Sequence, residues 1–230
     1  MTLYETIFKR RSVRKYDRMP LDEKTLDDIR TFITNTRQLP GQNARFEIMS
    51  ADKVKGASAP HYIMSFCPSG NAAYANVGYV LGKADLYIQS LGLGSLWLGM
   101  GNPKEKEKDF CIMLAFGKSD VPFRANAQEF NRLSISEISN SDNSIVQAAR
   151  LAPSACNSQP WKLFFENGRI AVRYFGRGLT QMLLKAKMSK IDMGIITRHL
   201  VTALENEGKE VKSITPKTSG KDFEIEMIYE

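Results

Sequence analysis

Hydrophobic residues recur at three- and four-residue spacing in two stretches of the chain, 77–91 and 196–204. Side chains at this spacing line one face of an α-helix, and a glycine shortly after such a run is typical of a helix end. Gly92 follows the first stretch and Gly208 follows the second. The pattern therefore predicts two helices that are related by a constant offset, since 208 minus 92 and 204 minus 88 both equal 116.

Each predicted helix is followed by a segment in which large apolar residues occupy every second position, and both segments begin with Lys-Asp-Phe. A period of two predicts a β-strand with one face toward the core. These faces are predicted to consist of Phe110, Ile112, Leu114 and Phe116 in the first strand and of Phe223, Ile225, Met227 and Tyr229 in the second.

The correspondence between the two halves continues upstream. Residues 26–33 and 141–151 both have the apolar spacing of amphipathic helices, and each is followed by a proline-bearing loop. Strands are predicted next, at 46–49 in one half and at 162–166 in the other, and Asn167-Gly168 after the second is a strong hairpin signal. These collinear matches predict an internal duplication. Two ordinary α+β halves with similar periodicity are the alternative.

Serine and asparagine dominate the segment 134–144, SISEISNSDNS, and this composition favours a loop over a helix or strand. The loop is predicted to join two repeats, about 1–133 and 141–230, within one α+β unit that spans residues 1–230.

Composition limits the class of protein. With 230 residues of which 43% are hydrophobic, the chain can bury a core, and no apolar run approaches the roughly 18 residues that span a bilayer. We expect a soluble, cytoplasmic protein without membrane contact. The three cysteines are an odd number without a CxxC pair, which argues against a disulfide framework and structural zinc. We expect Cys67 and Cys111 to be buried, inert thiols, and we expect no metal site.

The formal net charge of +7 is compatible with nucleic acid or with small anions as ligands. The lysines are dispersed and lack the interleaved aromatic residues of an RNA-binding sheet, so we expect no nucleic-acid partner. Thr2 and Glu5 form a possible capping box for a helix that ends near the basic run 9–15, KRRSVRK. Arginines crowded there repel one another unless they share an anion, and their planar forks suit phosphate or carboxylate. Solvated arginines at a helix end are the alternative.

The stretch 151–161, LAPSACNSQPW, is too polar for a core strand, and Pro153 and Pro160 restrict its backbone. It ends in Trp161, one of two tryptophans. This composition predicts a loop that is held in a fixed conformation.

Together, RRSVRKYD (10–17), LGLGSLWLG (91–99) and APSACNSQPW (152–161) resemble the FMN-dependent nitroreductase family, and the resemblance covers nearly the whole chain. It implies that the first motif binds the flavin phosphate and the pyrimidine edge of the ring, and that the segment after the glycine-rich helix end lies near flavin N5. It also implies that the proline-bounded loop packs on the flavin. A basic residue past the last core strand is expected to add a phosphate contact. The implied cofactor-binding residues are Arg10, Arg11, Ser12 and Arg14, then Leu98, Gly99, Met100 and Arg124, and finally Pro153, Ser154, Ala155, Asn157 and Gln159.

One feature departs from the family, in which the loop comes shortly after the arginine motif and packs on the flavin of the partner subunit. Here the loop lies in the second half, and the expected place, 39–46, lacks the serine and the tryptophan. Adding 116 to Arg10 and Arg14 gives Asn126 and Phe130, so the second repeat lacks the arginines. In a family homodimer, each of the two sites combines the arginine motif of one subunit with the loop of the other. The duplication therefore accounts for both missing motifs if they belong to the same one of two sites. The remaining site would join the arginines of the first repeat to the loop of the second.

The resemblance implies an α+β nitroreductase fold in which one chain imitates the family's homodimer. It implies an FMN-dependent oxidoreductase that uses NADH or NADPH to reduce nitroaromatics, quinones or similar small acceptors by two-electron transfer through flavin N5. The flavin carries the chemistry, so no catalytic side chain is predicted. A flavin-binding or sensor protein with little turnover is the alternative function. We expect a monomeric pseudo-dimer, with further self-association left open. We also expect Trp161 to anchor the loop and Cys156 to be a small buried residue.

Overall fold

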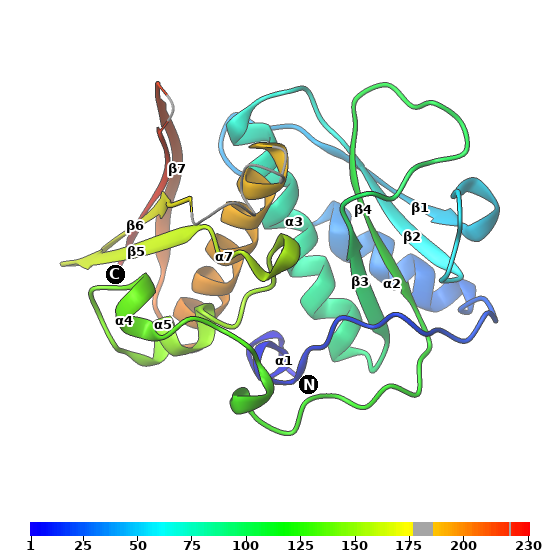
Figure 1. The fold of residues 1–230 in the computed structure, drawn as a ribbon, viewed down its shortest axis with the longest axis horizontal. Helices are drawn as coiled ribbons and strands as arrows, with labels where there is room; N and C mark the ends of the chain where they lie inside the picture. Colours follow the sequence, from blue (N-terminus) through cyan, green and yellow to red (C-terminus); the bar gives the residue numbers. More distant parts are fainter. Residues whose placement is uncertain (177–185, 221) are drawn as a thin grey trace.

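The computed structural model describes residues 1–176, 186–220 and 222–230. Two long helices, α3 (Asn71–Ser90) and α7 (Ala186–Asn206), lie side by side in the middle of the molecule, and a sheet lies on either side of the pair (Figure 1). The fold is therefore α+β, as predicted.

Both sheets are antiparallel and have four strands in the same relative order. The first sheet has the order β1-β2-β4-β3, and its strands are β1 (Arg45–Ser50), β2 (His61–Phe66), β3 (Gly94–Leu98) and β4 (Phe110–Gly117). The second has the order β5-β6-β8-β7, and its strands are β5 (Trp161–Glu166), β6 (Arg169–Tyr174), β7 (Val211–Ser219) and β8 (Asp222–Tyr229).

Shorter helices complete the fold and hold the chain between the sheets. They are α1 (Leu3–Lys9), α2 (Glu23–Thr34), α4 (Ile135–Ile138) and α5 (Ser144–Ala149), with the 3-10 turns η1 (Ala51–Lys53), η2 (Ala127–Glu129) and η3 (Ala155–Asn157). Within the described part of the chain, no helix is both long and apolar enough to cross a membrane.

Local sequence signals account for many of the element ends. Thr2 and Glu5 form the expected capping box of α1, and the helix ends at Lys9. Gly92 and Gly208, which follow α3 and α7, have φ of 84° and 71°, a left-handed backbone that glycine adopts without steric cost. The hairpin predicted at 167–168 joins β5 to β6.

The loop predicted at 134–144 is wrong over part of its length. Ser134 and Glu137 form a second capping box, which starts the short helix α4, and the side chain of Ile138 is fully buried. Serines at a helix start are capping residues, so a composition rich in serine does not by itself exclude a helix.

The predicted face of β4 also needs one correction. The pairing of β2 with β4 shifts register next to Phe66, which lies opposite Phe110, whereas the preceding residue Ser65 lies opposite Ile112. This irregularity places the Phe110 ring against Phe66, 6.2 Å between centroids, on the sheet face opposite to that of Ile112. In β8, by contrast, Phe223 and Ile225 are buried in strict alternation, as predicted.

Glycines allow α3 and α7 to approach so closely that their backbones touch. A Cβ on Gly78 would lie 1.9 Å from the carbonyl oxygen of Ile191, and a Cβ on Gly194 would lie 1.8 Å from that of Ala75. The two contacts are reciprocal, because 194 minus 78 and 191 minus 75 both equal 116. When a residue of one helix contacts the second helix and the equivalent residue of the second helix makes the same contact with the first, the arrangement is characteristic of two-fold symmetry.

We expect Gly194→Ala to lower the free energy of unfolding by roughly 1–3 kcal/mol, because the new methyl group must push the two helices apart. Gly82→Ala is the matched control, since its Cβ would have ordinary contacts of 3.5 Å with Arg198 and alanine favours the helix by about 1 kcal/mol. Urea denaturation of both variants measures the difference. Equal stability of the two variants would contradict a backbone contact at this crossing.

Candidate functional site

Asp85, on α3, is the centre of a buried polar network. It forms an ion pair with Arg10, whose Nε lies 3.1 Å from Oδ2, and the two side chains are 1% and 2% exposed. Gln89 and Ser95 donate hydrogen bonds to Oδ1, and Trp97 Nε1 donates to Oδ2 at 3.4 Å. Burial opposes the charged form, but the charge of Arg10 and these hydrogen bonds outweigh it, so the pKa of Asp85 is lowered.

The same network fixes the segment that follows α1. The backbone N–H of Arg11 donates to Gln89 Oε1 at 2.8 Å. Ser12 forms a parallel bridge with Ser95 at the start of β3, and Val13 N–H donates to the Ser95 carbonyl at 2.9 Å. The arginine motif is therefore an extended segment attached to both α3 and β3.

Arg124 and Arg132 approach Arg10 from the segment after β4, and we call these three residues the arginine cluster. Arg124 Nη1 donates a hydrogen bond to the carbonyl oxygen of Arg10. The guanidinium groups of Arg124 and Arg132 lie 4.2 Å and 5.5 Å from the centroid of the Phe130 ring. Cation–π contacts with one ring thus help to hold two like charges near each other.

The arginine cluster carries positive charge that its surroundings do not fully compensate. Burial, and then the charges of Arg10 and Arg124, lower the pKa of Arg132 to about 9. Burial, and then the charges of Arg10 and Arg11, also lower the pKa of Arg124. Among the described residues, Arg10 Nη2 and Arg132 Nε are buried without a hydrogen-bond partner. An anion that accepts hydrogen bonds would relieve both the repulsion and the missing contacts.

His199, on α7, adds no charge to this region. It is fully buried, and its Nδ1 lies 3.0 Å from the Ile195 carbonyl oxygen. Burial, and then the charge of Arg10, lower the pKa of His199 to about 3. The imidazole is therefore neutral at pH 7.

The proline-bounded loop 153–159 is attached to α7 and to itself. The backbone N–H of Ala155 donates to both carboxylate oxygens of Asp192, at 3.0 and 3.2 Å. Burial raises the pKa of Asp192 to about 8, although the Ala155 N–H favours its ionised form. Within the loop, Gln159 N–H donates to Ser154 Oγ at 2.9 Å.

The loop and the arginine cluster are in direct contact. Arg132 Nη1 donates to Asn157 Oδ1 at 2.7 Å, and Asn157 Nδ2 donates to the Asn131 carbonyl at 2.8 Å. The side chain of Gln159 accepts a hydrogen bond from Leu133 N–H at 2.9 Å. Both side-chain amides of the loop are therefore bound to residues of the segment after β4.

The end of β3 reaches the same face of α7 as the loop. A Cβ on Gly99 would lie 3.4 Å from the sulfur of Met188. Met188 and Asp192 are four residues apart on α7, so they share a helix face. Leu98 is half-buried in β3, whereas Met100 is 93% exposed. Two segments that the resemblance assigns to the flavin ring thus flank one face of α7.

Two of the expected arginines lie apart from these buried contacts. Arg14 is exposed, one residue beyond the buried Val13. Arg11 Nη2 forms an ion pair with Glu129 at 2.7 Å, and both side chains are about one-third exposed. Arg10 and Arg124 are the two expected arginines that join the cluster.

The structure contradicts one expectation for the loop and confirms another. Cys156 is exposed, not buried. Its φ is 51° and that of Asn157 is 54°, so the chain turns sharply here, and the inward contacts are made by Asn157 and Gln159. Trp161 is fully buried in the core, as expected for the anchor of the loop.

Sequence reasoning missed Asp85, Asp192 and Arg132. Asp85 lies within the apolar stretch 77–91 and Asp192 lies four residues before the stretch 196–204, and an acidic residue on a buried helix face is a usable signal of a buried partner. Arg132 belongs to none of the three motifs, and nothing in its local sequence distinguishes it from a surface arginine.

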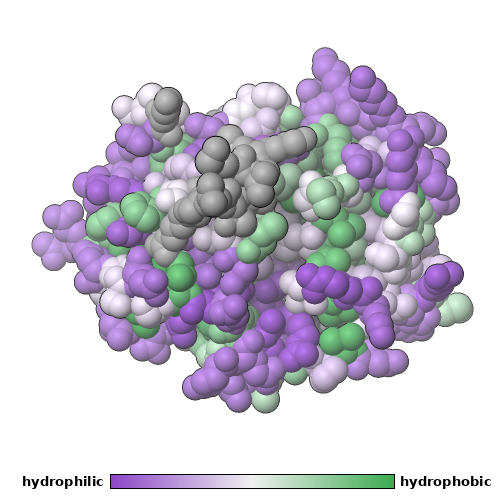
Figure 2. Space-filling model, in the orientation of Figure 1, coloured by the Kyte–Doolittle hydropathy of each residue, from purple (hydrophilic) through white to green (hydrophobic). Residues whose placement is uncertain are grey.

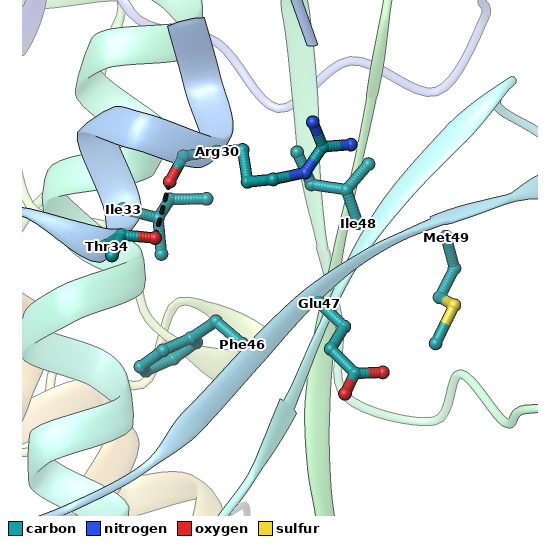
Figure 3. Close-up of a pocket in the computed structure, with 7 residues that line it drawn as sticks. All are labelled: Arg30, Ile33, Thr34, Phe46, Glu47, Ile48 and Met49. Atoms are coloured by element: carbon teal, nitrogen blue, oxygen red, sulfur yellow. Dashed lines mark hydrogen bonds between the residues drawn. The ribbon is translucent and has the colours of Figure 1, made fainter. Parts of the chain in front are cut away.

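A surface cavity of about 310 Å³ is separate from this site. Figure 3 shows that it lies between α2 and the edge strand β1, with Arg30 and Ile48 on its walls. It contains none of the expected binding residues. A smaller cavity of about 220 Å³ is lined by Arg11 and Val13 together with the loop 119–123.

Hydrophilic residues cover the region of α1 on the face drawn in Figure 2.

Comparison with known proteins identifies the family. Residues 2–204 match the family described as "Putative TM nitroreductase". The crystal structure of a "putative nitroreductase" from Thermotoga maritima superposes with a TM-score of 0.71 at 21% identity, covering 99% of this chain and 94% of that one. A nitroreductase family protein from Clostridium difficile 630 has a TM-score of 0.50 at 18% identity, covering 62% of this chain and 100% of that one. Among curated proteins, none matches the chain.

The match to the family model spans most of the sequence, including α3, most of α7 and all three motifs. The chain belongs to the nitroreductase family, a family of oxidoreductases, and it has the nitroreductase-like α+β fold.

Proposed function

We propose that the chain binds FMN, with the phosphate held by the arginine cluster. The observation that carries this proposal is that Arg10 is buried with Arg124 and Arg132 half-buried beside it, and that Arg10 Nη2 and Arg132 Nε have no hydrogen-bond partner among the described residues. Asp85 balances the charge of Arg10, which leaves the other two guanidinium groups for an anionic ligand. A terminal phosphate has close to two negative charges and accepts several hydrogen bonds, so the residues present fit this group.

The flavin ring would be held by the end of β3 and by the loop 153–159. Gly99, Ser154 and Ala155 have small side chains, which permit close approach of a planar ring to the backbone. The hydrogen bonds from Ala155 to Asp192 and from Arg132 to Asn157 fix the loop before any ligand binds. A site that is rigid in advance loses less entropy when its ligand binds. Leu98, Met100, Pro153 and Ser12 would complete the walls of this site.

When bound, FMN supplies two-electron chemistry at N5, with NADH or NADPH as the donor and a nitroaromatic, a quinone or a similar small molecule as the acceptor. The protein binds the phosphate, positions the ring and limits the access of water. We assign no side chain as an acid or base in this reaction. His199 is neutral and fully buried, which suits a packing role.

We also propose that one chain contains a complete site and acts as a monomeric pseudo-dimer. Arg10 and Asn157 belong to different halves of the sequence, yet both interact with Arg132. The equal strand orders and the reciprocal contacts of Gly78 and Gly194 support an internal duplication. The two halves would then be related to each other like the two subunits of a homodimer. We continue to expect a soluble, cytoplasmic protein that does not bind nucleic acid.

The proposed activity predicts a yellow protein that oxidises NADH or NADPH when a nitroaromatic or a quinone is present. We expect flavin absorbance bands and the release of FMN, not FAD, on denaturation. Steady-state absorbance at the nicotinamide band measures turnover. A yellow protein without turnover would support the alternative of a flavin-binding or sensor protein, and a colourless protein that fails to bind added FMN would reject both.

Arg132→Met should weaken FMN binding by roughly 1.5–3 kcal/mol, about 10- to 150-fold in Kd, because a hydrogen-bonded charge is lost while the apolar stem stays. Flavin fluorescence titration of the apoprotein measures the affinity. Arg18→Met, at an exposed position, is the matched control and should bind normally. Asn157→Ala removes the loop contact of Arg132, together with the hydrogen bond to the Asn131 carbonyl, and leaves the charge of Arg132 in place. An equal loss in the Asn157 and Arg132 variants would show that Arg132 acts through the loop and does not bind phosphate.

The monomeric site predicts that two defective chains cannot repair each other. Arg124→Ala should weaken phosphate binding, and Ser154→Asp should place a carboxylate against the flavin, so each variant should bind FMN poorly. Unfolding and refolding the two variants together should restore no binding, because each chain still contains one defect. The measurement is flavin content of the refolded mixture after gel filtration. Recovery of bound FMN in a dimer fraction would mean that the site is shared between two chains.

A further inference from the structure

Two cysteines lie at the same end of the two central strands of the first sheet, β2 and β4. Cys67 directly follows β2, and its N–H donates to the Asp109 carbonyl at 3.0 Å, next to the first residue of β4. Cys111 is the residue passed over by the register shift in the pairing of β2 with β4. Both are free thiols of the same core cluster, 7% and 3% exposed. They are 44 residues apart in sequence, because 111 minus 67 equals 44, so only the sheet brings them together.

The surroundings of the two thiols favour a thiolate at Cys67. A hydrogen bond from the Cys111 thiol, and then the positive charge of Lys187, lower the pKa of Cys67, although burial and Asp109 act in the opposite direction. The same interaction with Cys67, followed by burial, raises the pKa of Cys111. Lys187 Nζ is fixed here by a hydrogen bond to the Cys111 carbonyl at 2.5 Å. Cys67 is therefore the better nucleophile, and Cys111 is the thiol that stays protonated.

We propose that Cys67 and Cys111 form a redox-active dithiol, which a hydroperoxide converts to an intramolecular disulfide. The dithiol does not depend on FMN. Three observations support it: Cys67 and Cys111 lie in the same core cluster next to the register shift of the β2–β4 pair, the Lys187 ammonium group is bound to the Cys111 carbonyl, and Cys67 follows the last paired residue of β2.

The chemistry balances in two steps. The Cys67 thiolate attacks the hydroperoxide, the O–O bond breaks, and the Cys67 sulfur takes the terminal OH group to become a sulfenic acid. The leaving alkoxide or hydroxide takes up the proton that Cys67 lost on ionisation and departs as an alcohol or water. Cys111 sulfur then attacks the Cys67 sulfur, its proton leaves with the hydroxyl group as water, and the S–S bond forms. The two thiols lose two electrons, and the hydroperoxide gains them. Lys187 stabilises the attacking thiolate and is not consumed.

The strand register places Cys67 and Cys111 diagonally across the β2–β4 pair. Residues diagonal to each other across an antiparallel pair have Cα atoms about 7–8 Å apart, slightly beyond the range of disulfides. Cys111 lies within the irregularity of this pairing, and Cys67 directly follows Phe66, the last residue of β2. A small shift of the chain after Phe66 would bring the sulfur atoms to bonding distance.

The test treats the full-length protein with hydrogen peroxide and counts thiols after denaturation. We expect the wild-type chain to lose two of its three thiols and to gain a cross-link between the peptides that contain Cys67 and Cys111, seen by non-reducing peptide mass spectrometry. Cys156→Ser is the matched control, because Cys156 is the exposed thiol, and this variant should form the same cross-link. Cys67→Ser and Cys111→Ser should form none.

Dimedone labelling separates the roles of the two thiols. In Cys111→Ser, the sulfenic acid has no resolving partner, so dimedone should label Cys67. In Cys67→Ser, Cys111 should stay unlabelled at the same peroxide concentration. Oxidation confined to Cys156, or labelling of Cys111 in place of Cys67, would overturn the proposal. Circular dichroism of each serine variant confirms that its fold is intact, and a variant that fails to fold is replaced by the corresponding alanine variant.

Discussion

The close crossing of α3 and α7 is the contact on which the rest of the structure depends. Each helix carries a glycine where the other's backbone passes, and a methyl group at either position would overlap a carbonyl oxygen. The two helices face each other along their length and each supports one sheet, so they are buried on most sides. The crossing also positions the site, because Asp85 on α3 holds the arginine motif while Asp192 and Met188 on α7 lie against the loop and the end of β3.

Charge is distributed unevenly around this crossing. Asp85 is fully buried, and it is compensated by Arg10 and by three further hydrogen bonds, which is the condition under which a carboxylate is stable in a core. Arg132 is close to Arg10 and Arg124, and burial, followed by these like charges, lowers its pKa. The hydrogen bonds around Asp85 are complete, whereas Arg10 Nη2 and Arg132 Nε have no partner among the described residues, and the proposed anionic ligand rests on this difference.

The loop 153–159 shows how local strain is offset by tertiary contacts. Cys156, Asn157 and Gln159 all have positive φ, which residues other than glycine adopt rarely. Hydrogen bonds from Arg132 to Asn157, from Leu133 to Gln159 and from Ala155 to Asp192 hold the chain in this form. The partners come from α7 and from the segment after β4, so the conformation of the loop depends on elements far from it in sequence.

Much of this protein follows from its sequence alone. Periodicity located parts of both long helices and the strands β4 and β8, because the spacing of apolar side chains reflects which face of an element is buried, and the Asn-Gly pair located the hairpin at 167–168. The three motifs identified the family, and the constant offset of 116 indicated that the halves correspond. Glycine and capping residues marked the helix ends, since these signals act within a few residues.

Tertiary structure decided which polar groups meet. Arg10 and Arg14 look equivalent in the motif, yet one is buried against Asp85 and the other is exposed, because the chain is extended there and attached to β3. Arg132 contacts Asn157, and Asp192 contacts Ala155, because the packing of the helices brings these segments together. The pairing of Cys67 with Cys111 likewise depends on strand register and on an irregularity in it. Such contacts join residues distant in sequence, and local patterns carry no information about their partners.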